Sequence, residues 1–296
     1  MYIGMLLALF GTLLFSLKSI FIKFAYAQGL DANTVLVFRM AISVPFYLVI
    51  LSYLMIKRKQ QSYAVPLSSM LLLKVLGLGF LGYYLSSLLD LMGLEYISAQ
   101  LERLTLFTYP FMVAIIGYFL FKQPLSKRLL LSLLISYLGL WVVMGQELQI
   151  TGNNVVLGTV LVMGAALSFS FYVLLSKSLI NQIGSLLFTS LAMTASSVLV
   201  FIHGAIEIDF LALVITPQAW LWLFLLAILS TVLPSFMMSE AIQRIGPTQT
   251  GIMGTLGPIF TIVLAIYLLD EPITLYMFFG MMMVMCGVAV LMIKKK

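Results

Sequence analysis

Charged residues are scarce in this sequence. Asp, Glu, Lys and Arg make up 9% of the 296 positions, whereas 62% are hydrophobic. Soluble domains carry about 25% charged residues and are roughly half apolar. This composition excludes a soluble globular protein, a disordered chain and a nucleic-acid-binding protein. A membrane-spanning helix needs about 20 apolar residues, so the length accommodates roughly ten spans. It leaves no room for a soluble catalytic domain.

Cysteine and histidine occur once each, as Cys286 and His203. A single cysteine excludes an intramolecular disulfide and a cysteine metal site. In an apolar run it is expected to act as a small hydrophobic residue. The sequence also lacks a nucleotide-binding glycine loop, a zinc-ligand spacing and a nucleophile motif. We therefore expect no cofactor, no metal, no catalytic residues and no ATP-driven pumping.

Ten apolar runs of spanning length predict an all-α integral membrane protein. The first begins at Tyr2 without a basic segment or a small-residue cleavage site, so we expect it to be retained. The predicted helices cover residues 2–26, 33–56, 67–91, 98–121, 127–145, 155–178, 183–203, 219–240, 247–269 and 274–293. The predicted breaks are at Gly29, Pro66, Pro124, Gly152, Gly184, Pro217, Gly246 with Pro247, and Pro272.

Basic residues gather on one side of the predicted bundle. With the N-terminus placed inside, the inner ends carry Lys57, Arg58, Lys59, Lys122, Lys127, Arg128, Lys177, Arg244, Lys294, Lys295 and Lys296. The outer loops carry Asp31, Glu95, Glu147, Glu207, Asp209, Asp270 and Glu271, with no Lys or Arg. The positive-inside rule therefore predicts a multi-pass protein of the plasma membrane (the inner membrane in a bacterium) with both termini cytoplasmic.

The chain repeats itself, which predicts two domains at residues 1–147 and 148–296. A shift of 148 residues pairs Pro110 with Pro258, Pro124 with Pro272 and Gly139 with Gly287. Nearer the start a shift of 154 pairs Phe15 with Phe169, Ser16 with Ser170 and Lys23 with Lys177. Five helices per repeat place the second repeat upside down relative to the first. Inverted repeats are typical of alternating-access transporters; the alternative is a duplication that only builds a bundle.

Two stretches resemble the paired signature of the EamA-like family of the drug/metabolite transporter superfamily. They are "YISAQLERLTLFTYPFMVAIIGYFLFKQPLS" and "RIGPTQTGIMGTLGPIFTIVLAIYLLDEPIT". Each contains a central Pro and a polar turn ending in Pro. "FSLKSIFIKFAY" and "FRMAISVPFYL" resemble the first two helices of that family.

The resemblance implies a ten-helix carrier with cytoplasmic termini that exports or exchanges small organic metabolites. It also implies a central cavity lined by the first four helices of each repeat, with 127–145 and 274–293 at the periphery. The turn Lys122-Gln123-Pro124 departs from the pattern, because the family usually has an acidic residue before this Pro. The second turn, Asp270-Glu271-Pro272, fits.

Charged residues lie within the apolar helices of the first repeat. They are Lys18, Arg39, Asp90, Glu102 and Arg103, and their counterparts in the second repeat are Tyr172, Met193, Met238, Thr250 and Gly251. A charge at the centre of a span costs about 2.5–3.5 kcal/mol, so such residues usually face a bundle interior or a wet cavity. The second repeat builds the same unit without them. We interpret them as substrate-binding or proton-coupling residues. The alternatives are a salt-bridge network that fixes packing, or snorkelling to headgroups, which would suit Arg39 and Arg103 best.

Polar and aromatic residues extend this candidate site. Tyr83 and Ser87 share one helical face with Asp90, and Tyr109 lies on the next predicted helix. An alternative is that such hydroxyls only bond their own helix backbone. Pro110 and Pro258 are candidate hinges. Lys23 and Lys177 occupy matching positions, which favours interfacial anchors.

The leading hypothesis is a secondary active transporter of small polar or amphipathic metabolites, such as amino acids or related organic anions. Its expected partners are the lipid bilayer, a small-molecule substrate and a coupling proton or counter-substrate. A channel or receptor is the first alternative. An integral membrane enzyme is the second, and only Asp90 and Glu102 could serve it.

Overall fold

The computed structural model describes residues 2–59, 67–122, 127–254 and 256–292, and every regular element in these ranges is helical. In the first half these are α1 (Tyr2–Ala27), α2 (Ala32–Lys59), α3 (Ser69–Gly79), η1 (Phe80–Leu85), α4 (Ser86–Leu94), α5 (Ala99–Leu106), α6 (Tyr109–Phe121) and α7 (Lys127–Thr151). In the second half they are α8 (Asn154–Ile183), α9 (Ser185–Glu207), α10 (Pro217–Ala227), η2 (Ile228–Val232), α11 (Leu233–Gly254), α12 (Gly257–Leu268) and α13 (Leu275–Met292).

Eight helical stretches in these ranges are long and apolar enough to cross a membrane. They include α3 to α4 as one stretch, Ser69–Leu94, and α5 to α6 as another, Ala99–Phe121. Gly257–Leu268 and Leu275–Val288 are shorter apolar helices. Many large apolar side chains on these helices are exposed, as expected for a surface that faces lipid.

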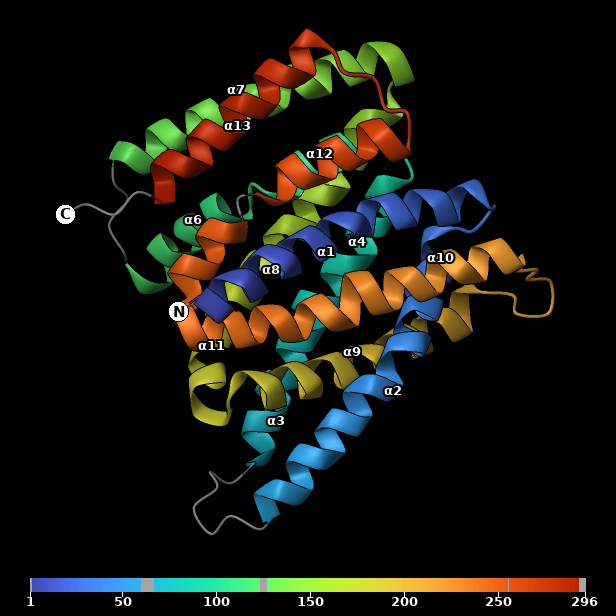
Figure 1. Ribbon diagram of the computed structural model, residues 1–296, viewed down its shortest axis with the longest axis vertical. Coiled ribbons are helices and arrows are strands. Elements are labelled where there is room, and N and C mark those ends of the chain that lie inside the picture. Colours follow the sequence, from blue (N-terminus) through green and yellow to red (C-terminus); the bar gives the residue numbers. More distant parts are fainter. Residues whose placement is uncertain (1, 60–66, 123–126, 255, 293–296) are drawn as a thin grey trace.

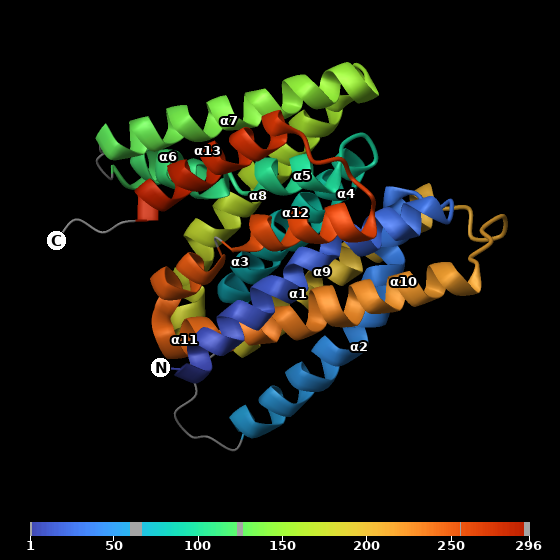
Figure 2. The same cartoon turned by 45° about the horizontal axis from the view of Figure 1, so that its top comes forward.

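Helices of the two halves pack against each other. The main contacts join α1 to α11, α2 to α9, and α4 to α8. The helix pair α7 and α13 lies side by side along one edge of the bundle (Figures 1 and 2). This agrees with the peripheral position that the resemblance implies for 127–145 and 274–293.

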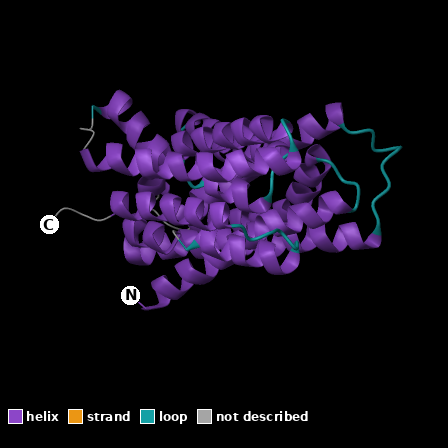
Figure 3. Cartoon of the chain, turned by 90° about the horizontal axis from the view of Figure 1, so that it is seen from above, coloured by secondary structure: helices purple, strands orange, loops and turns teal. Residues whose placement is uncertain are grey.

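Both ends of the described chain lie at one end of the bundle, which we call the terminal end (Figure 3). The opposite, distal end contains the turns between α4 and α5 and between α12 and α13 (Figure 1). The acidic residues that the sequence assigns to outer loops belong to this distal end.

Most predicted breaks are confirmed. Gly29, Gly152 and Gly184 end helices with positive φ angles of 83°, 95° and 85°, which glycine adopts without steric cost. Pro217 begins α10, and Pro272 lies between α12 and α13. The predicted breaks at Pro66 and Pro124 lie outside the described residues.

Four predicted helices are wrong in detail. The single helix expected over 98–121 is divided, because α5 ends at Leu106 and α6 begins at Tyr109. The expected break at Gly246 and Pro247 lies inside α11, so the helix predicted over 247–269 instead begins at Gly257. Two π-helical segments, η1 and η2, interrupt spans that were expected to be regular.

These irregularities follow the repeat. A shift of 148 residues carries η1 at Phe80 onto η2 at Ile228, and the start of α6 at Tyr109 onto the start of α12 at Gly257. Pro110 and Pro258 each occupy the first turn of the new helix rather than its interior. The first turn tolerates proline because no intrahelical bond is lost there. The hinge role of both prolines stays a prediction.

Candidate functional site

A buried ion pair joins α1 to α4. The Lys18 Nζ lies 2.5 Å from the Asp90 Oδ2, and the two side chains are 15% and 2% exposed. Lys18 and Asp90 are two of the residues that the sequence singles out. The structure therefore brings together a cation and an anion separated by 72 positions in the chain.

Glu102 adds a second buried carboxyl group from α5. Its Oε2 accepts a hydrogen bond of 2.6 Å from the Ser19 hydroxyl, and Ser19 follows Lys18 directly on α1. Asp90 and Glu102 act on each other electrostatically. The Asp90 Oδ1 and the Glu102 Oε1 receive no hydrogen bond from a donor group among the described residues, but the two carboxyl groups lie within hydrogen-bonding reach of each other. The pair can therefore share one proton beside the ion pair.

Two arginines complete a group of five charges, and both are buried. Arg103 is 9% exposed, and its Nε donates to the Thr261 hydroxyl at 3.0 Å. Thr261 donates in turn to the Ser16 carbonyl oxygen at 3.2 Å, which links α5, α12 and α1. Snorkelling to headgroups is therefore wrong for Arg103.

Arg39 on α2 is 3% exposed, so snorkelling is wrong for it as well. Its Nε and Nη2 have no hydrogen-bond partner among the described residues, although its charge acts on Asp90. A buried guanidinium with unmet donors is costly unless something accepts from it. A carboxylate or phosphate would fit, because guanidinium geometry matches both groups.

The predicted tyrosines lie in a different cluster. The Tyr83 hydroxyl lies 2.7 Å from the Tyr172 hydroxyl on α8. Tyr109 packs edge-on against Phe169, which stacks on Tyr172. Ser87 is half-buried on α4. Tyr172 is the second-repeat counterpart of Lys18, so the two repeats place an aromatic cluster and a charged group at matching positions of their first helices.

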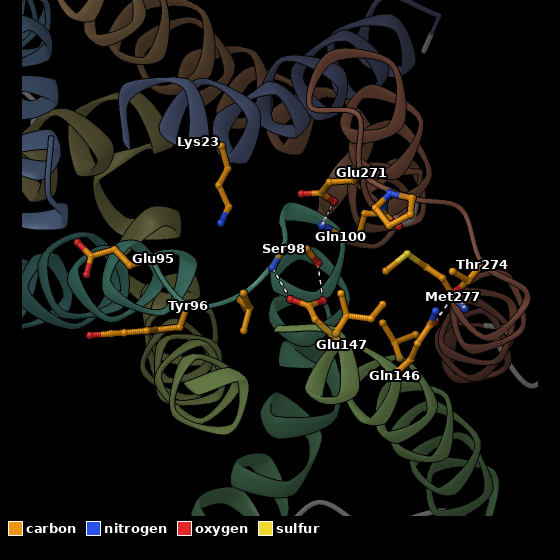
Figure 4. Close-up of a pocket in the computed structure, with 14 residues that line it drawn as sticks. Lys23, Glu95, Tyr96, Ser98, Gln100, Gln146, Glu147, Glu271, Thr274 and Met277 are labelled. Carbon is orange, nitrogen blue, oxygen red and sulfur yellow. Dashed lines mark hydrogen bonds between the residues drawn. The ribbon is translucent and has the colours of Figure 1, made fainter. Parts of the chain in front are cut away.

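A cavity of about 270 Å³ opens at the distal end, close to the charged group. The Lys23 side chain points into it, and Glu95, Glu147 and Glu271 lie around it (Figure 4). The Lys23 ammonium forms no hydrogen bond or ion pair with the described residues that line it. Lys177, its repeat counterpart, is exposed instead. Lys23 thus faces carboxylates in a cavity at the distal end, and its interpretation as an interfacial anchor stays a prediction.

The sequence does not identify the distal carboxylates as site residues, because acidic residues are common in the outer loops of a membrane protein. One signal could have found them. Under the shift of 148 residues Glu271 aligns with Gln123 and Glu147 with Lys295, so these acids are as specific to their repeat as the buried charges are.

Comparison with known proteins agrees with this architecture. The family described as the EamA-like transporter family matches the chain twice, at residues 2–145 and 156–293. The "Uncharacterized transporter YcbK" of Bacillus subtilis (strain 168) is 30% identical over 285 residues, covering 94% of this chain and 88% of the relative. The "Uncharacterized transporter YetK" of the same organism is 24% identical over 221 residues, covering 73% and 67%.

A solved crystal structure shares the fold, with a TM-score of 0.68 at 14% identity and coverage of 97% of this chain and 95% of that one. The helical bundle, the doubled sequence match and the relatives agree. The chain is an integral membrane protein that belongs to the EamA-like transporter family.

Proposed function

We propose that this protein is a secondary active transporter that exports or exchanges small polar or amphipathic organic metabolites, with amino acids and related organic anions as its preferred class. The observation that carries the proposal is the buried group Lys18, Arg39, Asp90, Glu102 and Arg103. It contains three basic and two acidic side chains. The unpartnered guanidinium donors of Arg39 favour an anionic group on the substrate.

Alternating access between two inverted five-helix repeats is the proposed mechanism. The two family matches support a duplication. Matching irregularities support equivalent local structures in both halves: besides η1 and η2, the left-handed residues Lys122 (φ 52°) and Asp270 (φ 53°) are 148 positions apart. Inverted repeats supply two related conformations around a site at their interface.

The carboxyl pair Asp90 and Glu102 is the proposed site for a coupling proton or a counter-substrate. Each has one oxygen held by a residue of α1, and the two carboxyl groups lie within hydrogen-bonding reach of each other. A proton or a substrate ammonium group could occupy this place in turn, because both compete for the same lone pairs. Competition of this kind would couple two transported species.

Uptake into proteoliposomes tests the proposal. We expect a screen of amino acids and organic anions to identify a solute that accumulates against its gradient, and a pH gradient to change the rate if protons are coupled. Accumulation would separate a carrier from a channel. Lys18→Met should remain inserted and folded but lose most of this uptake, because the cation of the site is gone.

Double variants supply the control. Breaking a buried ion pair on one side typically costs about 3–5 kcal/mol, because it leaves a charge stranded. If Lys18 only stabilises packing, Lys18→Met combined with Asp90→Asn should recover folding and uptake together. If Lys18 serves transport, the double variant should fold and stay inactive. Wild-type uptake by a well-expressed Lys18→Met protein would refute the role assigned to this lysine.

A further inference from the structure

The N-terminus of α5 is held by two carboxylates in an unusual way. Glu147 accepts the Ser98 amide through Oε1 and the Ser98 hydroxyl through Oε2, both at 2.6 Å. Glu271 accepts the Ala99 amide at 2.8 Å and the Gln100 amide at 3.3 Å. The Ser98 hydroxyl accepts from Leu101, so the first three amides of α5 are all bound. Figure 4 shows the bonds from Ser98 to Glu147 and from Gln100 to Glu271. Charged acceptors at a helix N-terminus form the stronger class of hydrogen bond.

The two carboxylates come from opposite halves of the chain. Glu147 lies near the end of α7, and Glu271 lies in the turn between α12 and α13. Glu147 therefore holds the turn before α5 within its own half, and Glu271 joins the start of α5 to the other half at the distal end. In an alternating-access transporter, contacts between the two repeats at one end are the contacts that must break when that end opens.

The helix held in this way carries the candidate site. Glu102 and Arg103 lie in the first and second turns of α5. Next to the contacts of Glu147 and Glu271, Ala99 packs with Ile20 and Ala265, and all three are fully buried. Ile20 follows Ser19, the residue that donates to Glu102. This apolar layer closes the distal side of the charged group for as long as the start of α5 stays in place.

We propose that Glu147 and Glu271 form the distal gate of the transporter: they position α5 over the charged group, and release of the α5 N-terminus opens the distal side. This rests on the proposed transport function. Glu147 and Glu271 are positioning residues, because they bind Ser98 and the backbone amides of Ala99 and Gln100 rather than the substrate. Their counterparts under the repeat shift are Lys295 and Gln123, so a gate at the terminal end would not use two carboxylates.

Cysteine labelling tests the gate without any substrate. Ala99→Cys, in a Cys286→Ala background, places a thiol in the sealed layer. A membrane-impermeant maleimide is then added from the distal side of proteoliposomes. Glu271→Ala should raise the labelling rate by about tenfold or more, because two hydrogen bonds to a charged group are lost. Glu271→Gln should raise the rate less than Glu271→Ala does, because its single amide oxygen can still accept from Ala99 while its NH₂ group cannot accept from Gln100.

Glu207→Ala is the matched control, since Glu207 is an exposed acid at the end of α9 and is not one of the two gate carboxylates. Its labelling rate should equal that of the parent. Equal rates for Glu271→Ala and the parent would overturn the gate. If Ala99→Cys does not fold, hydrogen exchange at residues 98–101 in otherwise unmodified protein gives the same comparison, with faster exchange in Glu271→Ala expected and unchanged exchange contradicting the proposal.

Labelling and transport measurements distinguish failure of the gate from failure of the proposed transport function. If Glu271→Ala is labelled faster but the parent protein itself moves no solute, the gate is supported and the proposed transport function is contradicted. A protein that transports solute but shows no change in labelling contradicts the gate alone.

Discussion

At the scale of single residues, the role of each buried charge depends on whether its neighbours supply a partner for it. Lys18 and Asp90 offset each other, but Arg39 has no acceptor of its own among the described residues. An ion pair that served only packing would be expected to satisfy its surroundings. The unmet guanidinium donors of Arg39 beside the pair instead support the proposed binding of an anionic group.

Glu271 gives the distal gate a defined response to pH. Its pKa is raised mainly by burial, while the Ala99 and Gln100 amides and Lys23 lower it and Glu147 raises it. An opened gate would hydrate Glu271 and return its pKa to the ordinary value. The closed gate therefore binds this proton more tightly than the open gate does. It is stabilised as the pH falls, and it loses that stabilisation as the pH rises from the ordinary pKa of Glu271 towards the raised pKa.

The measurement is the ratio of Ala99→Cys labelling rates between the parent and Glu271→Gln at each distal pH. Taking the ratio removes the effects of pH on the thiol and on the other charged groups that face Glu271. Those groups are Glu147 and Lys23, with Glu95 across the cavity. It should rise as the pH is taken up through the range that begins at the ordinary pKa of a glutamate carboxyl group. A ratio that falls over this range would contradict the expected direction.

The residue types of the site were predictable from the sequence, but their arrangement was not. Lys18, Arg39, Asp90, Glu102 and Arg103 stand out because charge is rare in apolar helices. Periodicity cannot tell which charges meet across helices, so the Lys18–Asp90 pair and the orphaned Arg39 required the structure. Glu147 and Glu271 looked like solvated acids because the groups they bind are backbone amides, which have no sequence signature.

At the scale of elements, two glycines set the distance between α7 and α13. A Cβ at Gly139 would lie 2.6 Å from the Gly280 carbonyl oxygen, and a Cβ at Gly280 would lie 2.7 Å from that of Gly139. Small residues allow membrane helices to approach this closely. A backbone atom cannot move aside as a side chain can, so a larger residue at either position must separate the helices.

We expect Gly139→Ala to lower stability by about 1–3 kcal/mol, the usual cost of overpacking. Thermal unfolding of the detergent-solubilised protein would show this as a lower melting temperature. Gly145→Ala on the same helix is the control, because nothing lies within 4 Å of a Cβ placed there. An equal melting temperature for the two variants would mean that α7 and α13 do not approach this closely.

The π-helical segments mark the limit of element prediction. The hydropathy of a segment does not depend on whether it forms an α-helix or a π-helix. The π-helical segments η1 and η2 therefore cannot be predicted from hydropathy. The divided helix at Leu106 and Tyr109 is similar, since the proline in the first turn of α6 could equally have kinked a continuous helix. The breaks at Gly29, Gly152 and Gly184, in contrast, were predicted correctly, because each glycine adopts a positive φ angle at a helix end.

At the scale of the whole molecule, the distribution of charge follows the direction of the bundle. The distal end gathers Glu95, Glu147 and Glu271, whereas basic residues such as Lys57 and Lys177 lie near the opposite ends of their helices. This segregation supports a single orientation with both termini cytoplasmic, because translocation of basic loops is disfavoured.

Reporter fusions test this orientation directly. A cytoplasmic reporter should be active after Lys59 and after Lys296, and an exported reporter should be active after Gly152, which follows α7 at the distal end. The Gly152 fusion is decisive because it separates the two repeats. An odd number of spans before Gly152 places it outside and turns the second repeat over, whereas an even number gives two repeats with the same orientation. A cytoplasmic signal at Gly152 would therefore remove the inverted relation on which both alternating access and a distal gate depend.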